Sequence, residues 1–208
     1  MATPPLLNPS DCAVVLVDIQ AGLAFATGSA DRQGIRNAAL ALAKTAVAFS
    51  VPVIVSTSAS KVYSGPLIPP LRAVLTNVTP IERRNMNLWE DESAKAAVVD
   101  TGRRTLVVAG LLTEACVSFP VLSALAEGYR VSVVADACGG LTHDSHWAAL
   151  QRMQQAGAVL TSWLQVLLEF QRDWTRRETY EAARGIVVEH AGGYGIGLDY
   201  ARDMIKPA

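Results

Sequence analysis

Residues 105–117 read TLVVAGLLTEACV, an unbroken apolar run that passes directly into a short polar segment carrying a cysteine. Similar runs of β-branched and aliphatic residues occur at residues 13–17, 53–56 and 130–135. Continuous rather than alternating hydrophobicity is typical of strands that are covered on both faces, as in a parallel sheet. We therefore expect four buried strands, and residues 158–161 are a candidate for another.

Segments with a helical pattern of apolar residues separate these runs. They lie at residues 32–49, 91–101, 118–127 and 146–156. Strands that alternate with helices predict βαβ units, so the fold class that we expect is α/β, a Rossmann-like three-layer α/β/α arrangement around a mostly parallel central sheet. A chain of 208 residues is expected to form a single domain over residues 1–208, with residues 175–208 as a C-terminal extension.

The composition narrows the classes of function. Half of the residues are apolar and the formal net charge is −1, so no basic surface is expected for nucleic acid. No apolar run reaches the roughly 18 residues that span a bilayer, and residues 1–11 lack the pattern of a signal peptide. The three cysteines suggest no disulfide framework. We expect a cytoplasmic protein whose partner is a small molecule, with no nucleic acid and no membrane involved.

Three chemically active side chains follow predicted strands. Asp18 ends the first strand, Arg83 follows a short predicted strand, and Cys116 follows the third buried run. Because ligands bind beyond the carboxyl ends of parallel strands, a carboxylate, a cation and a thiol are expected at one edge of the sheet, as nucleophilic catalysis requires. Taken singly, each has a simpler interpretation: Asp18 as a helix cap, Cys116 as a buried packing residue and Arg83 as a solvated charge.

Several segments together carry a resemblance to a known family. These are LVDIQ (16–20), IERRNMNLW (81–89), VVAGLLTEACV (107–117), VVADACGG (133–140) and ALQRMQQAGA (149–158). Their order resembles the isochorismatase-like cysteine hydrolase superfamily, closest to its YcaC-related branch, over roughly residues 10–175. The most specific element is G-x-x-T-x-x-C-V at residues 110–117. The resemblance implies the isochorismatase-like hydrolase fold.

The resemblance also implies an activity and its residues. It implies a hydrolase that cleaves the C–N bond of a small amide through a thioester on Cys116, with Asp18 and Arg83 as the other members of a catalytic triad. Most family members have lysine where this chain has Arg83. A cis peptide at Leu111–Leu112 is implied as well, which would turn the Leu112 N–H inward beside that of Cys116 as an oxyanion hole.

Further expectations concern the surroundings of the site. The helical turn after Thr113 and the charge of Arg83 are expected to lower the pKa of the Cys116 thiol, with Asp18 accepting its proton. Asn87 and Trp89 are predicted to bind substrate. The segment VIVSTSASKVY (53–63) lacks the histidine of the metal-binding nicotinamidases in the superfamily, so no metal is expected, and no cofactor is implied. A homo-oligomer is expected.

Two other functions stay open. One is isochorismatase chemistry, the cleavage of a vinyl ether, which needs no cysteine. The other is a non-catalytic oligomer that binds a metabolite. Cys12 and Cys138 are interpreted as packing residues, and GGYGIG (192–197) fails as a dinucleotide-binding motif because it follows no predicted strand and is predicted to open no helix.

Overall fold

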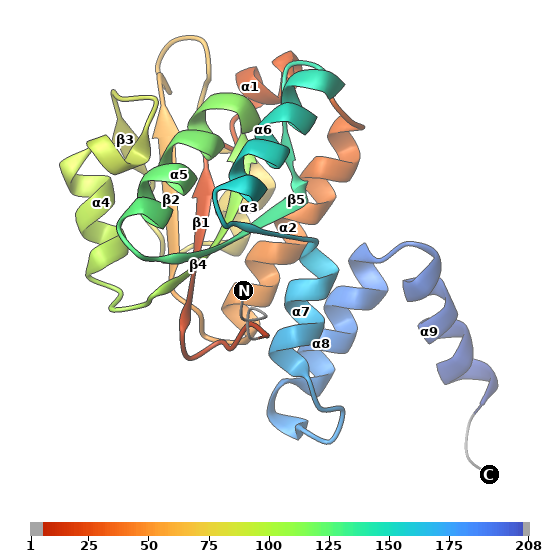
Figure 1. The fold of residues 1–208 in the computed structure, drawn as a ribbon. Helices are drawn as coiled ribbons and strands as arrows, with labels where there is room; N and C mark the ends of the chain where they lie inside the picture. The colour runs from red at the N-terminus through yellow and green to blue at the C-terminus, as the bar shows by residue number, and fades with distance from the viewer. Residues whose placement is uncertain (1–5, 206–208) are drawn as a thin grey trace.

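The computed structural model of the chain describes residues 6–205, and a six-stranded sheet forms its centre (Figure 1). The strands are β1 (Cys12–Val17), β2 (Val53–Ser58), β3 (Ile81–Arg83), β4 (Thr105–Leu111), β5 (Arg130–Gly139) and β6 (Val159–Thr161). They are all parallel and lie in the order β3-β2-β1-β4-β5-β6. The prediction of a parallel α/β fold is confirmed.

Helices cover both faces of the sheet (Figure 1). One face carries α4 (Glu92–Val99), α5 (Ser118–Ala126) and α6 (His143–Gln155), and the other carries α2 (Arg32–Ala48), α3 (Pro69–Val74), α7 (Trp163–Gln171) and α8 (Arg177–His190). The four predicted helices are present as α2, α4, α5 and α6. Shorter elements are α1 (Ala21–Ala26), the 3₁₀ turn η1 (Leu88–Glu90) and the π-helical turn η2 (Thr113–Val117). None of the described helices combines the length and the apolar character needed to cross a membrane.

Burial explains the continuous hydrophobic runs of the sequence. All residues of β1 and β4 are buried, because each of these strands lies between two neighbours and under helices on both faces. Helix α2 starts at Asp31, whose side chain accepts hydrogen bonds from the backbone N–H groups of Gln33 and Gly34. Its buried face is mostly alanine, which brings the helix close to the sheet. The core therefore forms around the strands that lead into the predicted site.

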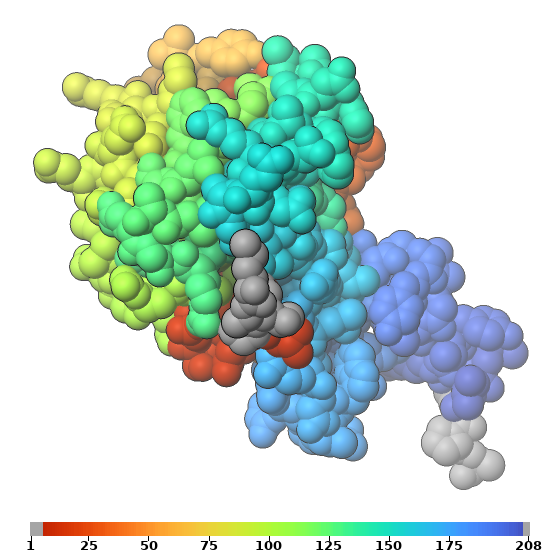
Figure 2. Space-filling view, viewed as in Figure 1, coloured from red at the N-terminus to blue at the C-terminus, as the bar shows by residue number. Residues whose placement is uncertain are grey.

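The glycine-rich segment GGYGIG (192–197) in the C-terminal region contains the start of a helix, contrary to the prediction from sequence. The prediction that GGYGIG opens no helix was wrong, since Gly193 begins α9 (Gly193–Met204). A Cβ added at Gly195 would lie 2.5 Å from the Val188 carbonyl oxygen, so this glycine permits close contact between α9 and α8. Helix α8 packs against α2 and α7, whereas α9 extends outward beyond α8 (Figure 2). The division into a domain and an extension stays a prediction.

Gly110 permits the close approach of the two central strands. It pairs with Val17 across β1 and β4, its φ is +154°, and an added Cβ would lie 2.1 Å from the Val17 carbonyl oxygen. Any side chain there collides with backbone, which cannot move without shifting the strand that ends at Asp18. The glycine of G-x-x-T-x-x-C-V is thus required by strand packing.

We expect Gly110→Ala to lower the free energy of unfolding by about 1–3 kcal/mol, because overpacking forces the two strands apart. Gly185→Ala is the matched control, since Gly185 lies in α8 with open space around its Cα. Alanine there should raise the free energy of unfolding by about 0.5–1 kcal/mol through helix propensity. Urea denaturation followed by circular dichroism measures both. Equal stability of the two variants would contradict the packing argument.

Candidate active site

The strand order changes direction at the adjacent strands β1 and β4. The chain places β2 and β3 on one side of β1, and β4, β5 and β6 on the other. This is the order of doubly wound sheets, in which ligands bind at the carboxyl ends of the two strands where the direction reverses. Asp18 follows β1, and Cys116 lies in η2 just after β4. Arg83 ends β3 and reaches the same point, so the structure brings the three predicted residues together.

Asp18 lies in a turn after β1 that directs its carboxylate toward β2 and Arg83. Its φ is +52°, a left-handed conformation that aspartate tolerates better than most residues. The side chain is fully buried. It accepts hydrogen bonds from the hydroxyls of Ser56, at 3.4 Å, and Ser58, at 3.0 Å. The carboxylate therefore has fixed partners on the neighbouring strand β2.

Arg83 forms an ion pair with Asp18, and both side chains are 0% exposed. Its Nη2 donates to Asp18, Nη1 donates to the Asn85 carbonyl, and Nε donates to the Ser56 hydroxyl at 3.5 Å. The interpretation of Arg83 as a solvated surface charge is therefore wrong. Removing one partner from a buried ion pair typically costs about 3–5 kcal/mol, because the remaining charge is left without compensation.

The Cys116 thiol is half-buried and lies close enough to Asp18 and Arg83 for both side chains to act on its pKa. Burial and the nearby Asp18 carboxylate raise the pKa of this thiol, although Arg83 opposes them. The expectation of a lowered pKa was therefore wrong in direction. The pKa of the thiol is raised because the positive charge of Arg83 is already paired with Asp18. Its remaining effect on the thiol is too small to offset burial.

The pKa of the Asp18 carboxyl is also raised, chiefly by burial, against the opposing effects of Arg83 and of the serine hydroxyls. A carboxylate with a raised pKa is a stronger base, and a thiol with a raised pKa keeps its proton until it reacts. The role of Asp18 as the acceptor of the thiol proton stays a prediction.

The backbone before Cys116 provides a hydrogen-bond donor. The Leu111–Leu112 peptide bond is cis. The Leu112 carbonyl accepts hydrogen bonds from the N–H groups of Ala115 and Val117, both at 3.2 Å. Within residues 6–205, the Leu112 N–H itself donates to no protein atom. This donor is therefore available to a ligand beside the thiol.

Asn87 and Trp89 have other contacts. Asn87 begins η1, where its Oδ1 accepts from the Trp89 N–H at 3.1 Å and its Nδ2 donates to Ser123 at 3.1 Å. The Trp89 ring packs edge-on against Tyr129 with centroids 5.2 Å apart. One of these contacts caps η1, one joins it to α5, and one packs it against Tyr129, so they favour capping and packing. Their expected role in substrate binding stays a prediction.

Three residues of the site were not anticipated. Ser56 and Ser58 hold Asp18, and Gln20 donates to the Ser58 carbonyl at 3.0 Å while accepting from the Ser58 N–H at 3.0 Å. Ser56 and Ser58 could have been predicted from the sequence, because alternate polar residues at the end of an apolar strand lie on the same face. Gln20, fully buried directly after the Asp18 turn, gave no comparable signal.

The other two cysteines lie away from this chemistry. Cys12 and Cys138 are buried, and burial raises the pKa of their thiols to about 11 and about 12. Across the described part of the chain, no group of three or more His, Cys, Asp or Glu side chains is arranged to hold a metal ion. Of the three cysteines, Cys116, which the sequence predicts to be the nucleophile, is therefore the most accessible to solvent.

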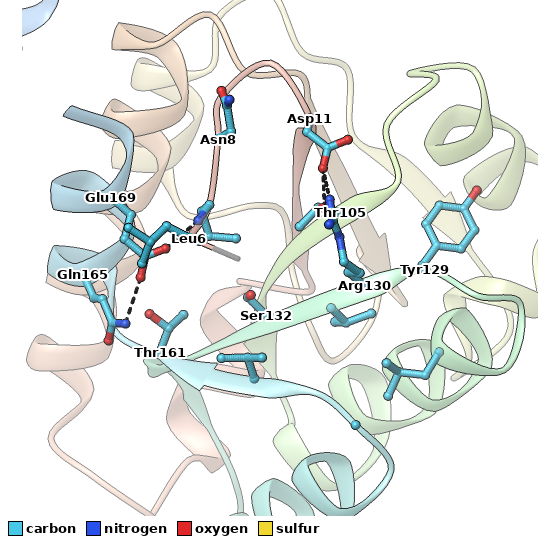
Figure 3. Close-up of a pocket in the computed structure, with 15 residues that line it drawn as sticks. Leu6, Asn8, Asp11, Thr105, Tyr129, Arg130, Ser132, Thr161, Gln165 and Glu169 are labelled. Atoms are coloured by element: carbon cyan, nitrogen blue, oxygen red, sulfur yellow. Dashed lines mark hydrogen bonds and ion pairs between the residues drawn. The ribbon is translucent and has the colours of Figure 1, made fainter. Parts of the chain in front are cut away.

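A cavity of about 470 Å³ lies at the opposite edge of the sheet (Figure 3). Thr105, Arg130 and Val159, which line it, begin β4, β5 and β6. Seven residues of extended strand separate the two ends of β4 by about 20 Å. The labelled side chains of Ser132 and Thr161 point into this cavity, which contains none of the three predicted catalytic residues. It is therefore separate from the site at Cys116.

Comparisons with known proteins agree with this geometry. The isochorismatase domain model matches residues 12–165. The chain is 39% identical to the probable hydrolase YcaC of Escherichia coli K12 over 189 residues, which is 90% of each sequence. Over 58 residues, 26% of this chain and 27% of the relative, it is 47% identical to the nicotinamidase of the same organism.

Solved structures give the same result across almost the whole chain. YcaC from Pseudomonas aeruginosa, with hexane-2,5-diol and covalent acrylamide, has a TM-score of 0.91 and 38% identity, covering 96% of this chain and 98% of that one. YcaC from Escherichia coli, an octameric hydrolase of unknown specificity, has a TM-score of 0.92 and 38% identity, covering 99% and 100%. The fold, the matched domain and these relatives show that the chain belongs to the isochorismatase family of hydrolases.

Proposed function

We propose that this protein is a cysteine-dependent hydrolase that cleaves the C–N bond of a small amide through a thioester on Cys116. The observation that carries the proposal is the placement of a half-buried thiol near a fully buried carboxylate–guanidinium pair, both members of which act on the pKa of the thiol. A packing cysteine needs no such partners, whereas a nucleophile needs a base within reach and a group that fixes the base.

The proposed mechanism follows from these contacts. The Cys116 Sγ attacks the carbonyl carbon as its proton passes to Asp18, and the carbonyl oxygen becomes an oxyanion held by the N–H groups of Leu112 and Cys116. Asp18 then gives the proton to the leaving amine as the C–N bond breaks. Water, deprotonated by Asp18, attacks the thioester carbonyl carbon. The C–S bond then breaks, the Cys116 sulfur takes the proton back from Asp18, and a carboxylic acid is released. Arg83 remains charged throughout and holds Asp18 in place.

A relative supports the chemistry. The Pseudomonas aeruginosa YcaC structure holds acrylamide, a small amide, in covalent form. Acrylamide adds to thiols, so a reactive cysteine in this chain is expected to form the same kind of adduct. The thiol environment favours an acyl-transfer mechanism over vinyl ether cleavage, which uses no nucleophilic sulfur. A small substrate fits the partial burial of Cys116.

Acrylamide should label Cys116 and leave Cys12 and Cys138 unmodified in the folded protein. The reason is that the latter two are buried and have strongly raised thiol pKa values, whereas Cys116 has a base in contact with it. Peptide mass spectrometry after brief exposure near neutral pH measures the three sites. Cys116→Ala is the matched control and should show no adduct and no amide hydrolysis. Equal labelling of all three cysteines in wild-type protein would contradict an activated nucleophile.

Turnover should fall as the pH is lowered through the pKa of Asp18, because only the carboxylate form accepts the thiol proton. Since burial raises that pKa, the midpoint of the fall should lie above about 3.9, the ordinary value for aspartate. Asp18→Asn should lower kcat by about 100-fold or more and remove this acid limb. The pH dependence of kcat/KM on a panel of small amides measures both, with circular dichroism showing that the variant is folded. Retention of the acid limb in Asp18→Asn would assign it to another group.

We also propose a homo-oligomer, as in the octameric Escherichia coli relative. Helix α9 packs on α8 and exposes apolar side chains, namely Tyr194, Ile196, Tyr200 and Met204. An exposed apolar group of this kind is typical of a surface that is buried between subunits.

Light scattering should give a mass that is a multiple of the 22.1 kDa chain. Ile196→Asp combined with Tyr200→Asp should shift the protein to smaller species, because burying two carboxylates in an interface is unfavourable. Val99→Asp is the control, since Val99 is exposed on α4, away from α9 (Figure 1). A monomeric wild type would overturn this proposal.

A further inference from the structure

Two side chains of the η2 turn connect the proposed oxyanion site to helix α6. The Thr113 hydroxyl lies 2.7 Å from Nδ1 of His146. The Glu114 Oε1 accepts hydrogen bonds from the Leu141 N–H at 2.8 Å and from the Ser145 hydroxyl at 3.1 Å. The turn that carries Cys116 is thus joined by side chains to the beginning of α6.

The packing around this connection is close. Thr113 is 0% exposed, and the Glu114 Oε2 is buried without a hydrogen-bond partner among residues 6–205. A Cβ added at Gly140 would lie 2.5 Å from that oxygen and 2.9 Å from the His146 Cβ, so Gly140 leaves the space that both side chains occupy. The Gly140 carbonyl in turn accepts from the Gly28 N–H at 3.1 Å. The loop before α6 is therefore fixed on both sides.

His146 is suited to hold a neutral hydroxyl. Burial lowers the pKa of its half-buried imidazole, although the Glu114 carboxylate opposes this, and the nearby His143 lowers it further. The ring is therefore neutral near pH 7, and depending on its tautomer Nδ1 either accepts a hydrogen bond from the Thr113 hydroxyl or donates one to it. Either arrangement fixes the Thr113 side chain.

We propose that His146, acting through Thr113, is a positioning residue that keeps the Leu112 N–H aligned with the carbonyl group that Cys116 attacks. Thr113 directly follows Leu112, and the Leu112 carbonyl is already held by the N–H groups of Ala115 and Val117. The hydrogen bond between the Thr113 hydroxyl and His146 holds the side chain of the next residue. Residues 112–113 are therefore fixed both through the backbone and through a side chain. The proposal rests on the proposed cysteine hydrolase function, and it adds a role for a helix that supplies no catalytic group.

Two reactions of the same thiol separate positioning from nucleophilicity. With p-nitrophenyl acetate, the Cys116 Sγ–C bond forms, the carbonyl oxygen becomes an oxyanion, the C–O bond breaks and p-nitrophenolate leaves, while the thiol proton passes to Asp18. With iodoacetamide, Sγ displaces iodide from a saturated carbon, the thiol proton again passes to Asp18, and no oxyanion forms. Only the first reaction depends on the Leu112 N–H.

His146→Ala should lower the acylation rate constant with p-nitrophenyl acetate by about 10- to 100-fold, since misaligned donors lose much of their effect. The KM for this ester and the rate of iodoacetamide alkylation should stay within about twofold of wild type, because the thiol and its base are untouched. His146→Asn should recover most of the acylation rate, because its amide can occupy the place of Nδ1. The His143→Ala control, on the same helix with a 76% exposed side chain, should leave both reactions unchanged.

Thr113→Val provides the same test if His146→Ala does not fold, because valine keeps the shape of threonine without its hydroxyl. The double variant should be no slower than either single variant, since both remove one interaction. Acylation by His146→Ala within about twofold of wild type overturns the positioning role. So does a parallel loss of acylation and alkylation that His146→Asn does not restore, which indicates general disruption. A wild-type protein that is alkylated but never acylated overturns the proposed hydrolase function itself, and the positioning role with it.

Discussion

The buried ion pair between Asp18 and Arg83 is the interaction on which the site depends. It joins the carboxyl ends of β1 and β3 across β2, the strand between them, whose Ser56 and Ser58 hydroxyls complete the coordination of the carboxylate. Two charges without exposure to water are tolerated only when each is fully paired and hydrogen-bonded. The three strand ends therefore have little freedom to move independently, and a thiol placed beside them meets a base of fixed orientation.

The same pair accounts for the state of the thiol. A free guanidinium beside Cys116 would favour the thiolate, but this guanidinium already compensates Asp18, so burial dominates and the thiol stays protonated. A site of this kind keeps the sulfur in its thiol form until an electrophile is present. In the proposed reaction the nucleophile forms only when that electrophile accepts the electron pair and Asp18 accepts the proton. The raised pKa of Asp18 fits this role, because it brings the base closer to the thiol in proton affinity.

Local sequence predicted the sheet and the chemical groups, and it failed where distant contacts decide the outcome. Continuous apolar runs identify β1 and β4 because both strands are covered on both faces. By contrast, Arg83 and Arg84 are alike in sequence, and only the pairing of Arg83 with Ser58 decides which one is buried. The helix at Gly193 depends on contact with α8, and the direction of the Cys116 pKa depends on a sum of opposing effects from several strands. None of these is visible in a window of neighbouring residues.

Arginine at position 83, where the resemblance to the family implies lysine, changes which group can carry protons. A lysine amine with a lowered pKa can exchange a proton during a reaction, whereas a guanidinium remains charged at any physiological pH. In return, the planar guanidinium directs separate donors to Asp18, to the Asn85 carbonyl and to Ser56, which a single ammonium group cannot match with the same rigidity. Proton transfer in the proposed reaction is therefore confined to Asp18 and Cys116. Arg83 contributes the fixed charge and geometry that make a buried carboxylate possible at the position where the thiol needs a base.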